Sequence, residues 1–419
     1  MLKFQNCKLQ TRLIAQSPMI HFQGGCEGAT LRGSEVKPKL DRFLNRKIDE
    51  LEKQGACDKS RIAYINQEKG ALNYKLSIRG MENVSRLYLN DKKDFPIVYG
   101  NRDDKILILR DAELTIICMN RSLQKLIETY LVEFFAVTNF GYMQNKGFGS
   151  FMPKEYILSS QRNNVVKDVR KWLKQKCKAE KCFYMKYENR MKKDVTSYVP
   201  YFNDIKDFYD LLKTGINSRG EYSRSYVYQY MHLRGIDNEK VWMKTEEIAP
   251  ALKSAGDVRI KDNKQQSEKN LNAKYVRALL GVSPKVEFLN ACGDRKNKGK
   301  VMVKINDLEK YIERMDSPIF FKIIDQYVFI CADRIPEEIY GRTFVFSSQL
   351  KYGGNSQNAQ LGITKGKIGD LSVPTQKELT DVGFTIDDLL EHFVKYYNKE
   401  ETGEGTAKLK KFRKEVHHE

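Results

Sequence analysis

The chain has 419 residues, more than one typical domain, and 41% of them are hydrophobic, which is enough for about two or three cores. Lysine and arginine number 73 against 54 aspartates and glutamates, so the formal net charge is +19. This excess favours a polyanionic partner: nucleic acid, an anionic membrane surface or an acidic protein. No apolar run approaches the roughly 18 residues of a membrane span. The first residues also lack the apolar core of a secretory signal, so we expect a cytoplasmic protein without a membrane partner.

The eight cysteines are scattered and form no CxxC pair. Cys177 and Cys182 lie closest together, but no second pair or nearby histidine completes a zinc site. We therefore expect no metal and no cofactor. Free thiols in a reducing compartment are the default interpretation.

The N-terminal region begins with a predicted strand over 8–22, which Pro18 should break. A helix is expected from an N-cap at Ser34, because Val36, Leu40 and Phe43 then share one face. Its other side is cationic, with few acidic residues to balance it. That side is either a solvated face or a phosphate-binding one. Its basic residues are Arg32, Lys37, Lys39, Arg42 and Arg46.

Further strands are predicted by apolar alternation, and one helix by helical periodicity. The strands lie at 72–79, 95–99, 106–109, 114–119 and 150–158, and the helix at 122–137. The order strand, helix, strands, helix, strand is typical of a split βαβ, or ferredoxin-like, domain.

A glycine-rich segment follows the second helix, with Gly141, Gly147 and Gly149 around one lysine, Lys146. Glycine permits backbone conformations in which successive amides point at one anion, and the lysine adds a cation beside them. Tyr142 and Phe148 could offer flat faces for bases. The segment is therefore either a loop that grips a nucleic-acid backbone or a turn that only redirects the chain.

The central region turns helical and aromatic. A basic amphipathic helix is predicted over 165–177, and tyrosines then crowd 184–230 with Arg219, Arg224 and Arg234 among them. Tyrosine with arginine is typical of single-strand nucleic-acid binding, but half-buried tyrosines of a small helical domain are the favoured interpretation for most of them. The polar segment 254–272 is expected to be a flexible loop.

Order returns in the last third of the chain. Strands are expected at 286–289, 301–304, 317–323 and 327–330, with a helix at 384–397. Ser317-Pro318 followed by apolar residues repeats the pattern at Ser17-Pro18, which suggests two related α+β halves. The predicted domains are an N-terminal domain (1–160), a helical insertion with a basic loop (161–272), a second half (273–398) and a charged tail (399–419).

Four segments resemble proteins of the CRISPR-associated RAMP superfamily. The segment 141–149 is similar to the glycine-rich loop of that superfamily, and 29–34 is similar to the opening of its first helix. Two further segments, 275–281 and 317–323, resemble the two-domain Cmr subunit of type III effector complexes.

The resemblance implies an α+β fold of tandem ferredoxin-like (RRM-like) RAMP domains with a helical insertion. It implies an RNA-binding subunit of a ribonucleoprotein in antiviral defence. This subunit would grip CRISPR RNA or target RNA and assemble with other effector subunits. The residues expected to contact RNA are Arg32, Lys37, Lys39, Arg42, Gly141, Tyr142, Lys146, Gly147, Phe148, Gly149, Arg162 and Arg277.

Two alternatives remain at the level of sequence. Some RAMP proteins are metal-independent endoribonucleases that cut CRISPR repeats, and His21 is the one candidate here for a general base or acid. A packed strand histidine without chemistry is the competing interpretation. No carboxylate constellation for a two-metal nuclease and no phosphate-binding GxxxxGK[ST] motif is present. The second alternative is a basic scaffold that binds only proteins.

Overall fold

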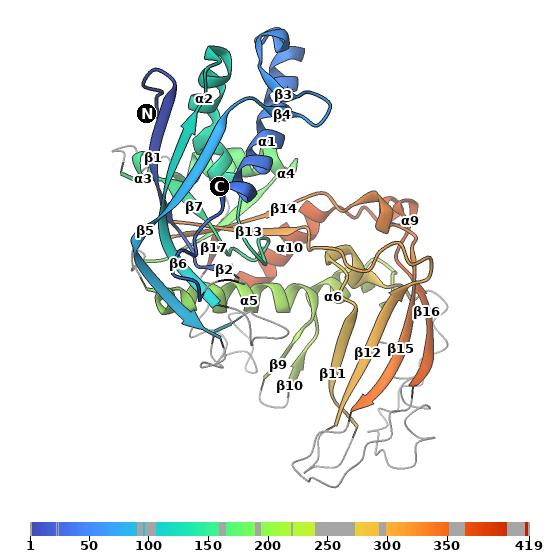
Figure 1. Ribbon diagram of the computed structural model, residues 1–419. Coiled ribbons are helices and arrows are strands. Elements are labelled where there is room, and N and C mark those ends of the chain that lie inside the picture. The colour runs from blue at the N-terminus through green and yellow to red at the C-terminus, as the bar shows by residue number, and fades with distance from the viewer. Residues whose placement is uncertain are drawn as a thin grey trace. The chain divides into compact units, whose positions relative to one another are not determined.

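The fold is mixed α+β with several antiparallel sheets, which confirms the predicted class (Figure 1). The computed structural model describes residues 2–21, 23, 25–89, 95–96, 106–158, 165–188, 194–218, 221–238, 273–292, 299–351, 365–399 and 415–417. The chain divides into two compact units. Unit 1 comprises Met1–Asp207, Ile319–Asp333 and Tyr396–Glu419, and unit 2 comprises Phe208–Pro318 and Arg334–Lys395.

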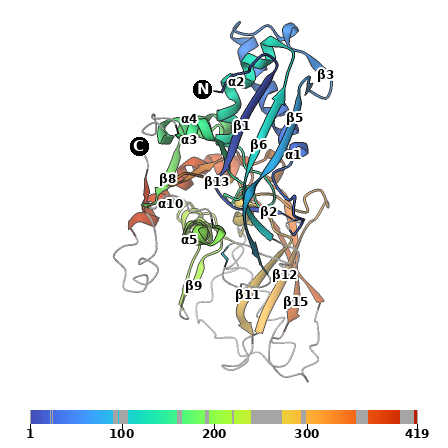
Figure 2. The ribbon, with the colours of Figure 1, turned by 60° about the vertical axis from the view of Figure 1, so that its left-hand side comes forward.

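The first sheet of unit 1 is built around β6, and all its pairings are antiparallel. Strands β1 and β2 pair with one edge of β6, and β5 pairs with the other edge. Strand β7 extends the sheet beyond β1. In both ribbon views β1, β6 and β5 run side by side (Figure 2). The predicted break at Pro18 is confirmed, because β1 ends before it and β2 begins after it. The strands are β1 (Lys8–Ala15), β2 (Met19–His21), β5 (Lys75–Tyr88), β6 (Ile106–Ile117) and β7 (Phe151–Pro153).

A second sheet of unit 1 has the antiparallel order β13-β14-β8-β17. These strands are β8 (Cys182–Lys186), β13 (Ile319–Ile324), β14 (Tyr327–Ala332) and β17 (Val416–His417). Strand β8 lies in the predicted insertion and β17 in the predicted tail, so strand pairing crosses two of the predicted domain boundaries. All six residues of β13 are buried, and the sequence alone does not reveal which distant strand covers such a run.

Helices of unit 1 pack on these sheets. Helix α1 (Gly33–Lys53) contacts β5, α2 (Arg121–Val137) contacts β7 and β13, and α4 (Val165–Cys177) contacts β14 and β8. Lys47 on α1 also forms an ion pair with Glu133 on α2, with 2.8 Å between Nζ and Oε1. The predicted N-cap at Ser34 is wrong. The N-cap is Arg32, two residues earlier, because the amides of Glu35 and Val36 both donate to its carbonyl.

Among the described residues, unit 1 also contains a hairpin and two further helices. The hairpin of β3 (Tyr64–Asn66) and β4 (Ala71–Leu72) follows α1, and the short helix α3 (Lys154–Leu158) follows β7. Helix α5 (Val199–Lys213) begins in this unit and ends in unit 2. The predicted strand at 150–158 is therefore only three residues long before the chain turns helical.

Unit 2 contains a four-stranded antiparallel sheet in the order β11-β12-β15-β16. Tyr275 packs against Phe344 and Phe346 of β15, with ring centroids 5.5 and 5.1 Å apart. The elements of this unit are the hairpin β9 (Ile216–Ser218) and β10 (Glu221–Ser223), α6 (Tyr226–His232), β11 (Lys285–Cys292), β12 (Gly299–Asp307), β15 (Thr343–Lys351), β16 (Lys365–Ser372) and α9 (Gln376–Asp381), with most of α10 (Ile386–Lys399).

The remaining predictions have mixed outcomes. The segments 106–109 and 114–117 belong to the single strand β6, which continues through Asp111, and 118–119 lie beyond its end. Several tyrosines of the aromatic region are buried, among them Tyr198, Tyr228 and Tyr230, as the favoured interpretation required. The segment 254–272 and most of 95–99 lie outside the described residues. None of the described helices has the length and apolar character needed to cross a bilayer.

Candidate nucleic-acid interface

The glycine-rich segment joins the sheet that contains β2 to the sheet that contains β13. On one side Tyr142 bridges to Ile20 of β2, and Ser17 Oγ donates to the carbonyl of Gly147 at 2.7 Å. On the other side the amide of Phe321 on β13 donates to the carbonyl of Asn145 at 3.0 Å. The segment therefore fills the space between β2 and β13 and makes backbone bonds to both.

The amides of this segment are largely used inside the protein. Gly141 donates its N–H to Glu35 Oε1 at 2.8 Å, and Gly149 donates to the carbonyl of Pro18 at 2.9 Å. The amides of Lys146 and Gly147 donate to carbonyls within the segment, at 2.9 and 3.3 Å. These four N–H groups therefore already have acceptors inside the protein.

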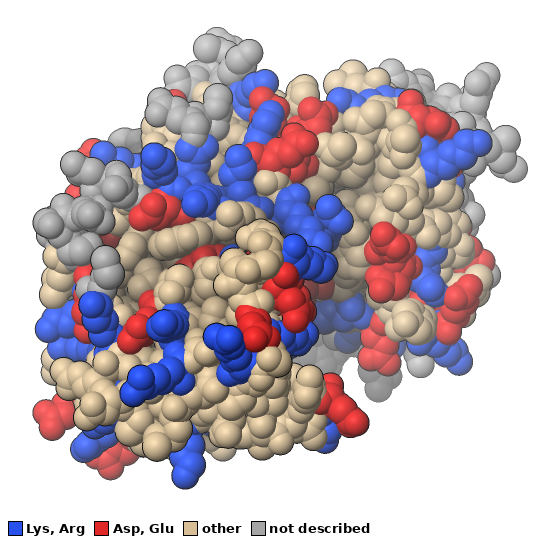
Figure 3. Space-filling view, turned by 90° about the horizontal axis from the view of Figure 1, so that it is seen from above, with Lys and Arg blue, Asp and Glu red and all other residues tan. Residues whose placement is uncertain are grey.

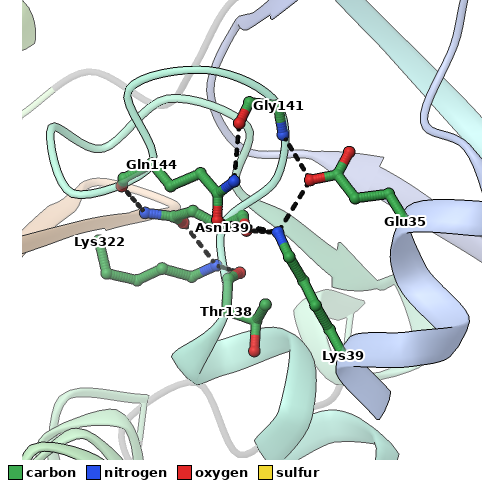
Figure 4. Close-up of polar contacts among 7 residues, drawn as sticks. All are labelled: Glu35, Lys39, Thr138, Asn139, Gly141, Gln144 and Lys322. Carbon is green, nitrogen blue, oxygen red and sulfur yellow. Dashed lines mark hydrogen bonds and ion pairs between the residues drawn. The ribbon is translucent and has the colours of Figure 1, made fainter. Parts of the chain in front are cut away.

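Two lysines fix the start of the segment (Figure 4). Lys39 Nζ, on α1, donates to Glu35 Oε1 at 2.8 Å, to the Asn139 carbonyl at 3.0 Å and to Gln144 Oε1 at 2.8 Å. Lys322 Nζ, on β13, donates to the Thr138 carbonyl at 2.6 Å and to Asn139 Oδ1 at 3.1 Å. Lys39 thus anchors the segment to a helix, and Lys322 anchors it to a strand.

The aromatic and basic side chains of the segment are mostly turned inward. Phe148 is 0% exposed and stacks on Phe202 with ring centroids 4.1 Å apart, so it offers no face to a base in this conformation. Lys146 Nζ is shielded from solvent and lies 5.9 Å from the ring centroid of Phe321. Tyr142 is half-buried and keeps part of its side chain at the surface.

The five basic residues predicted for the cationic side of α1 fall into two groups. Lys37 pairs with Asp41 at 2.7 Å and lies 4.2 Å from the ring centroid of Tyr74, and Lys39 is held as described above. Both are therefore committed to internal contacts. The other three, Arg32, Arg42 and Arg46, are exposed. Arg32 donates to Gln23 Oε1, and Arg42 makes one long 3.4 Å bond to the Pro38 carbonyl.

Charged side chains of both signs share the face drawn in Figure 3, where Lys and Arg gather in several groups with fewer Asp and Glu among them. Two predicted RNA contacts remain, Arg277 and Arg162. Arg277 in unit 2 is only 7% exposed, with its guanidinium 5.5 Å from the ring centroid of Tyr228. Arg162 lies outside the described residues.

His21 is buried at the end of β2, with 9% of its surface exposed. Its Nδ1 accepts a hydrogen bond from the amide of Gln23 at 3.0 Å. Burial lowers the pKa of His21, the positive charge of Arg32 lowers it further, and Glu35 opposes the shift. A neutral, packed imidazole follows from this environment. Within the described ranges, no group of three or more His, Cys, Asp or Glu could hold a metal ion.

Neither Lys322 on β13 nor Lys176 on α4 was singled out in the sequence analysis. The signal for Lys322 is one lysine in the otherwise apolar run of β13, where it is 0% exposed. A buried ammonium needs acceptors, and here the carbonyl end of α2 supplies one, where the helix dipole also favours a cation.

Comparison with protein families gives two matches in series. Residues 6–216 match the family model of the Cmr1 N-terminal domain, and residues 222–415 match that of the Cmr1 C-terminal domain. No curated protein matches the chain closely enough to count as a relative. The two matches cover nearly the whole chain and confirm the resemblance to the two-domain Cmr subunit. The chain therefore belongs to the Cmr1 family of type III CRISPR effector subunits.

Proposed function

We propose that this effector subunit binds CRISPR RNA or target RNA through the exposed arginines of α1, with the glycine-rich segment as the joint that holds the surface together. The observation that carries the proposal is the pair Arg42 and Arg46. They lie one helical turn apart and are exposed, and neither forms an ion pair with another described residue. Cations left without acidic partners are suited to phosphates, which arginine contacts in a planar, two-pronged geometry.

The proposed fold is a pair of ferredoxin-like modules. The first runs β1-α1-β5-β6-α2-β7, and in its sheet β1 and β6 are the central strands between β7 and β5. The second runs β8-α5-β13-β14-α10-β17, with β8 and β14 central between β17 and β13. Both orders support the βαββαβ pattern. In this scheme the sheet of β11, β12, β15 and β16 is an insertion into the second module.

The test is RNA binding by the full chain over a series of salt concentrations. Each lost phosphate contact should lower the slope of log K against log salt by about 0.7 for a single strand, so Arg42→Gln with Arg46→Gln should lower it by about 1.4. The control is Arg61→Gln with Lys69→Gln, which removes the same charge from exposed positions after α1. Equal slopes for the two double variants would remove α1 from the RNA interface.

The alternatives predict different results. A protein-only scaffold predicts no RNA binding by the wild type at low salt. A repeat-cutting ribonuclease predicts cleavage of CRISPR-repeat RNA by protein treated with a chelator, and loss of that cleavage in His21→Ala. The buried ring and the occupied Nδ1 of His21 support the binding role over this activity.

A further inference from the structure

Besides the exposed arginines of α1, unit 1 has a second group of cations. This group lies beside the glycine-rich segment, on the same face of β13 as Lys322. Lys176, in the last turn of α4, places its Nζ 3.4 Å from the ring centroid of Phe320. Phe320 and Lys322 are two positions apart on β13, so their side chains leave the same face of the strand about 7 Å apart. Lys176 and Lys322 therefore converge on one region of unit 1.

The charge of this region is not balanced. Among the described residues, Lys322 bonds to a carbonyl and an amide oxygen but to no carboxylate, and Lys39 shares the carboxylate of Glu35 with the amide of Gly141. Lys176 forms no hydrogen bond or ion pair with another described residue, although it is half-buried. Lys176 differs in this respect from Lys37 and Lys47, whose ammonium groups each have a carboxylate within 2.8 Å.

The pKa directions agree with this geometry. Burial lowers the pKa of Lys176; Cys177, Asp333 and Cys331 oppose the shift, and Arg46 of α1 adds to it. Burial lowers the pKa of Lys322 strongly, and the charges of Lys176 and Lys39 lower it further. Geometry carries the same point: Lys39 and Lys322 both bond to Asn139, and Arg46 follows Lys39 by two turns on the same face of α1. An anion beside these cations would relieve their mutual repulsion.

We propose that Lys176 and Arg46 bind a phosphate group between α1, α4 and β13, with Lys322 and Lys39 behind them supplying positive potential. The inference rests on the proposed function, because the phosphate is assigned to an RNA strand. Lys176 would act as a point charge whose ammonium bonds to no other described residue, and Arg46 as the exposed second contact. Lys322 and Lys39 stay on their carbonyl and amide partners and do not touch the ligand.

The test compares Lys176→Met with Lys171→Met, which removes an exposed lysine from the same helix. Binding of a single-stranded RNA to the full chain is measured by fluorescence anisotropy at 0.1 M salt and over a salt series. At that salt, losing one phosphate contact should weaken binding roughly fivefold and lower the salt slope by about 0.7. We expect this for Lys176→Met, and a smaller effect for Lys171→Met. Lys176→Met should keep the melting temperature of the wild type, because a desolvated cation is replaced by an apolar side chain.

Proton uptake gives a readout that a purely structural lysine would not change. A phosphate beside Lys176 raises its pKa toward the usual 10.5, so RNA binding should take up protons in a pH range below that value. Calorimetry in two buffers of different ionisation enthalpy measures the uptake, which should fall in Lys176→Met and persist in Lys171→Met. Equal affinities, slopes and uptake for the two variants would overturn the proposal.

Inorganic phosphate separates the failure of this site from the failure of RNA binding. If wild-type protein binds no RNA but phosphate raises its melting temperature more than that of Lys176→Met, the anion site stands and the proposed function fails. If the wild type binds RNA and the two variants are alike, only the site fails. Binding of RNA with and without a terminal phosphate then shows whether the site takes the end of an RNA chain or an internal phosphodiester. If Lys176→Met weakens binding of the phosphorylated RNA alone, the bound phosphate is the terminal one.

Discussion

Gly149 closes the glycine-rich segment against its own beginning, and its substitution tests whether that segment is a structural joint. It has φ +69°, and a Cβ at this position would lie 1.8 Å from the carbonyl oxygen of Phe140 and 2.7 Å from its carbonyl carbon. Both contacts are with backbone, so no side-chain rotation relieves them. The amide of Phe140 donates to the Gly149 carbonyl, and that of Gly149 donates to the Pro18 carbonyl, each at 2.9 Å.

The cost of Gly149→Ala has two parts. A left-handed conformation costs a non-glycine residue about 1 kcal/mol. Moving residue 149 away from Phe140 sacrifices two backbone hydrogen bonds, each contributing about 1 kcal/mol net. We therefore expect a loss of about 3 kcal/mol in the free energy of unfolding.

Gly55→Ala is the matched control, because Gly55 also has φ +69° but no atom within 4 Å of the added Cβ. It should lose only about 1 kcal/mol. The measurement is urea unfolding of both variants and the wild type, followed by circular dichroism. Equal losses in Gly149→Ala and Gly55→Ala would refute the close contact with Phe140 and the role of the segment as a joint.

Three further predictions concern side chains in or beside the segment. The pKa of Lys322 in the folded protein lies below its usual 10.5, so the unfolded chain binds more protons than the folded one between those two values. The free energy of unfolding should therefore rise with pH toward 10.5, and urea unfolding of Lys322→Met at several pH values should show a smaller rise. Phe148→Ala should cost about 3–5 kcal/mol in urea unfolding because its ring is fully buried, whereas Tyr142→Ala should cost less, and equal losses would contradict the stacking of Phe148 on Phe202. Lys146→Ala should change the salt slope of RNA binding less than Arg46→Gln, because its ammonium is shielded; a full-unit change in filter binding would return Lys146 to the interface.

Local patterns predicted the elements of the fold well. The predicted helix 165–177 has the same bounds as α4, and the predicted 122–137 differs from α2 by one residue. Both helices have one apolar face, which a window of the sequence contains completely. The strand break at Pro18 and the positive φ at Gly141, Gly147 and Gly149 follow equally from local chemistry.

The candidate site was predicted less well, because the number of acceptors around a cation depends on distant residues. Lys39 and Arg42 look alike as basic residues on one helix, but only Lys39 meets Gln144 and the carbonyl of Asn139, about a hundred residues away. Lys37 is likewise withdrawn by Asp41 and the carbonyl of Leu72. The exposed arginines remain as candidates only after these contacts are known.

By itself the sequence determined the class of the fold, the positions of most helices and strands, the cationic character of the chain and its family. Each of these depends on composition, periodicity or short motifs, which are local properties. Only the tertiary structure decided that Phe148 is core, that the amides of Gly141 and Gly149 are already bonded, and that Lys322 and Lys176 converge. The burial and the hydrogen bonds of these residues form only in the folded chain, where β2 and β13, three hundred residues apart in sequence, both pair with the glycine-rich segment.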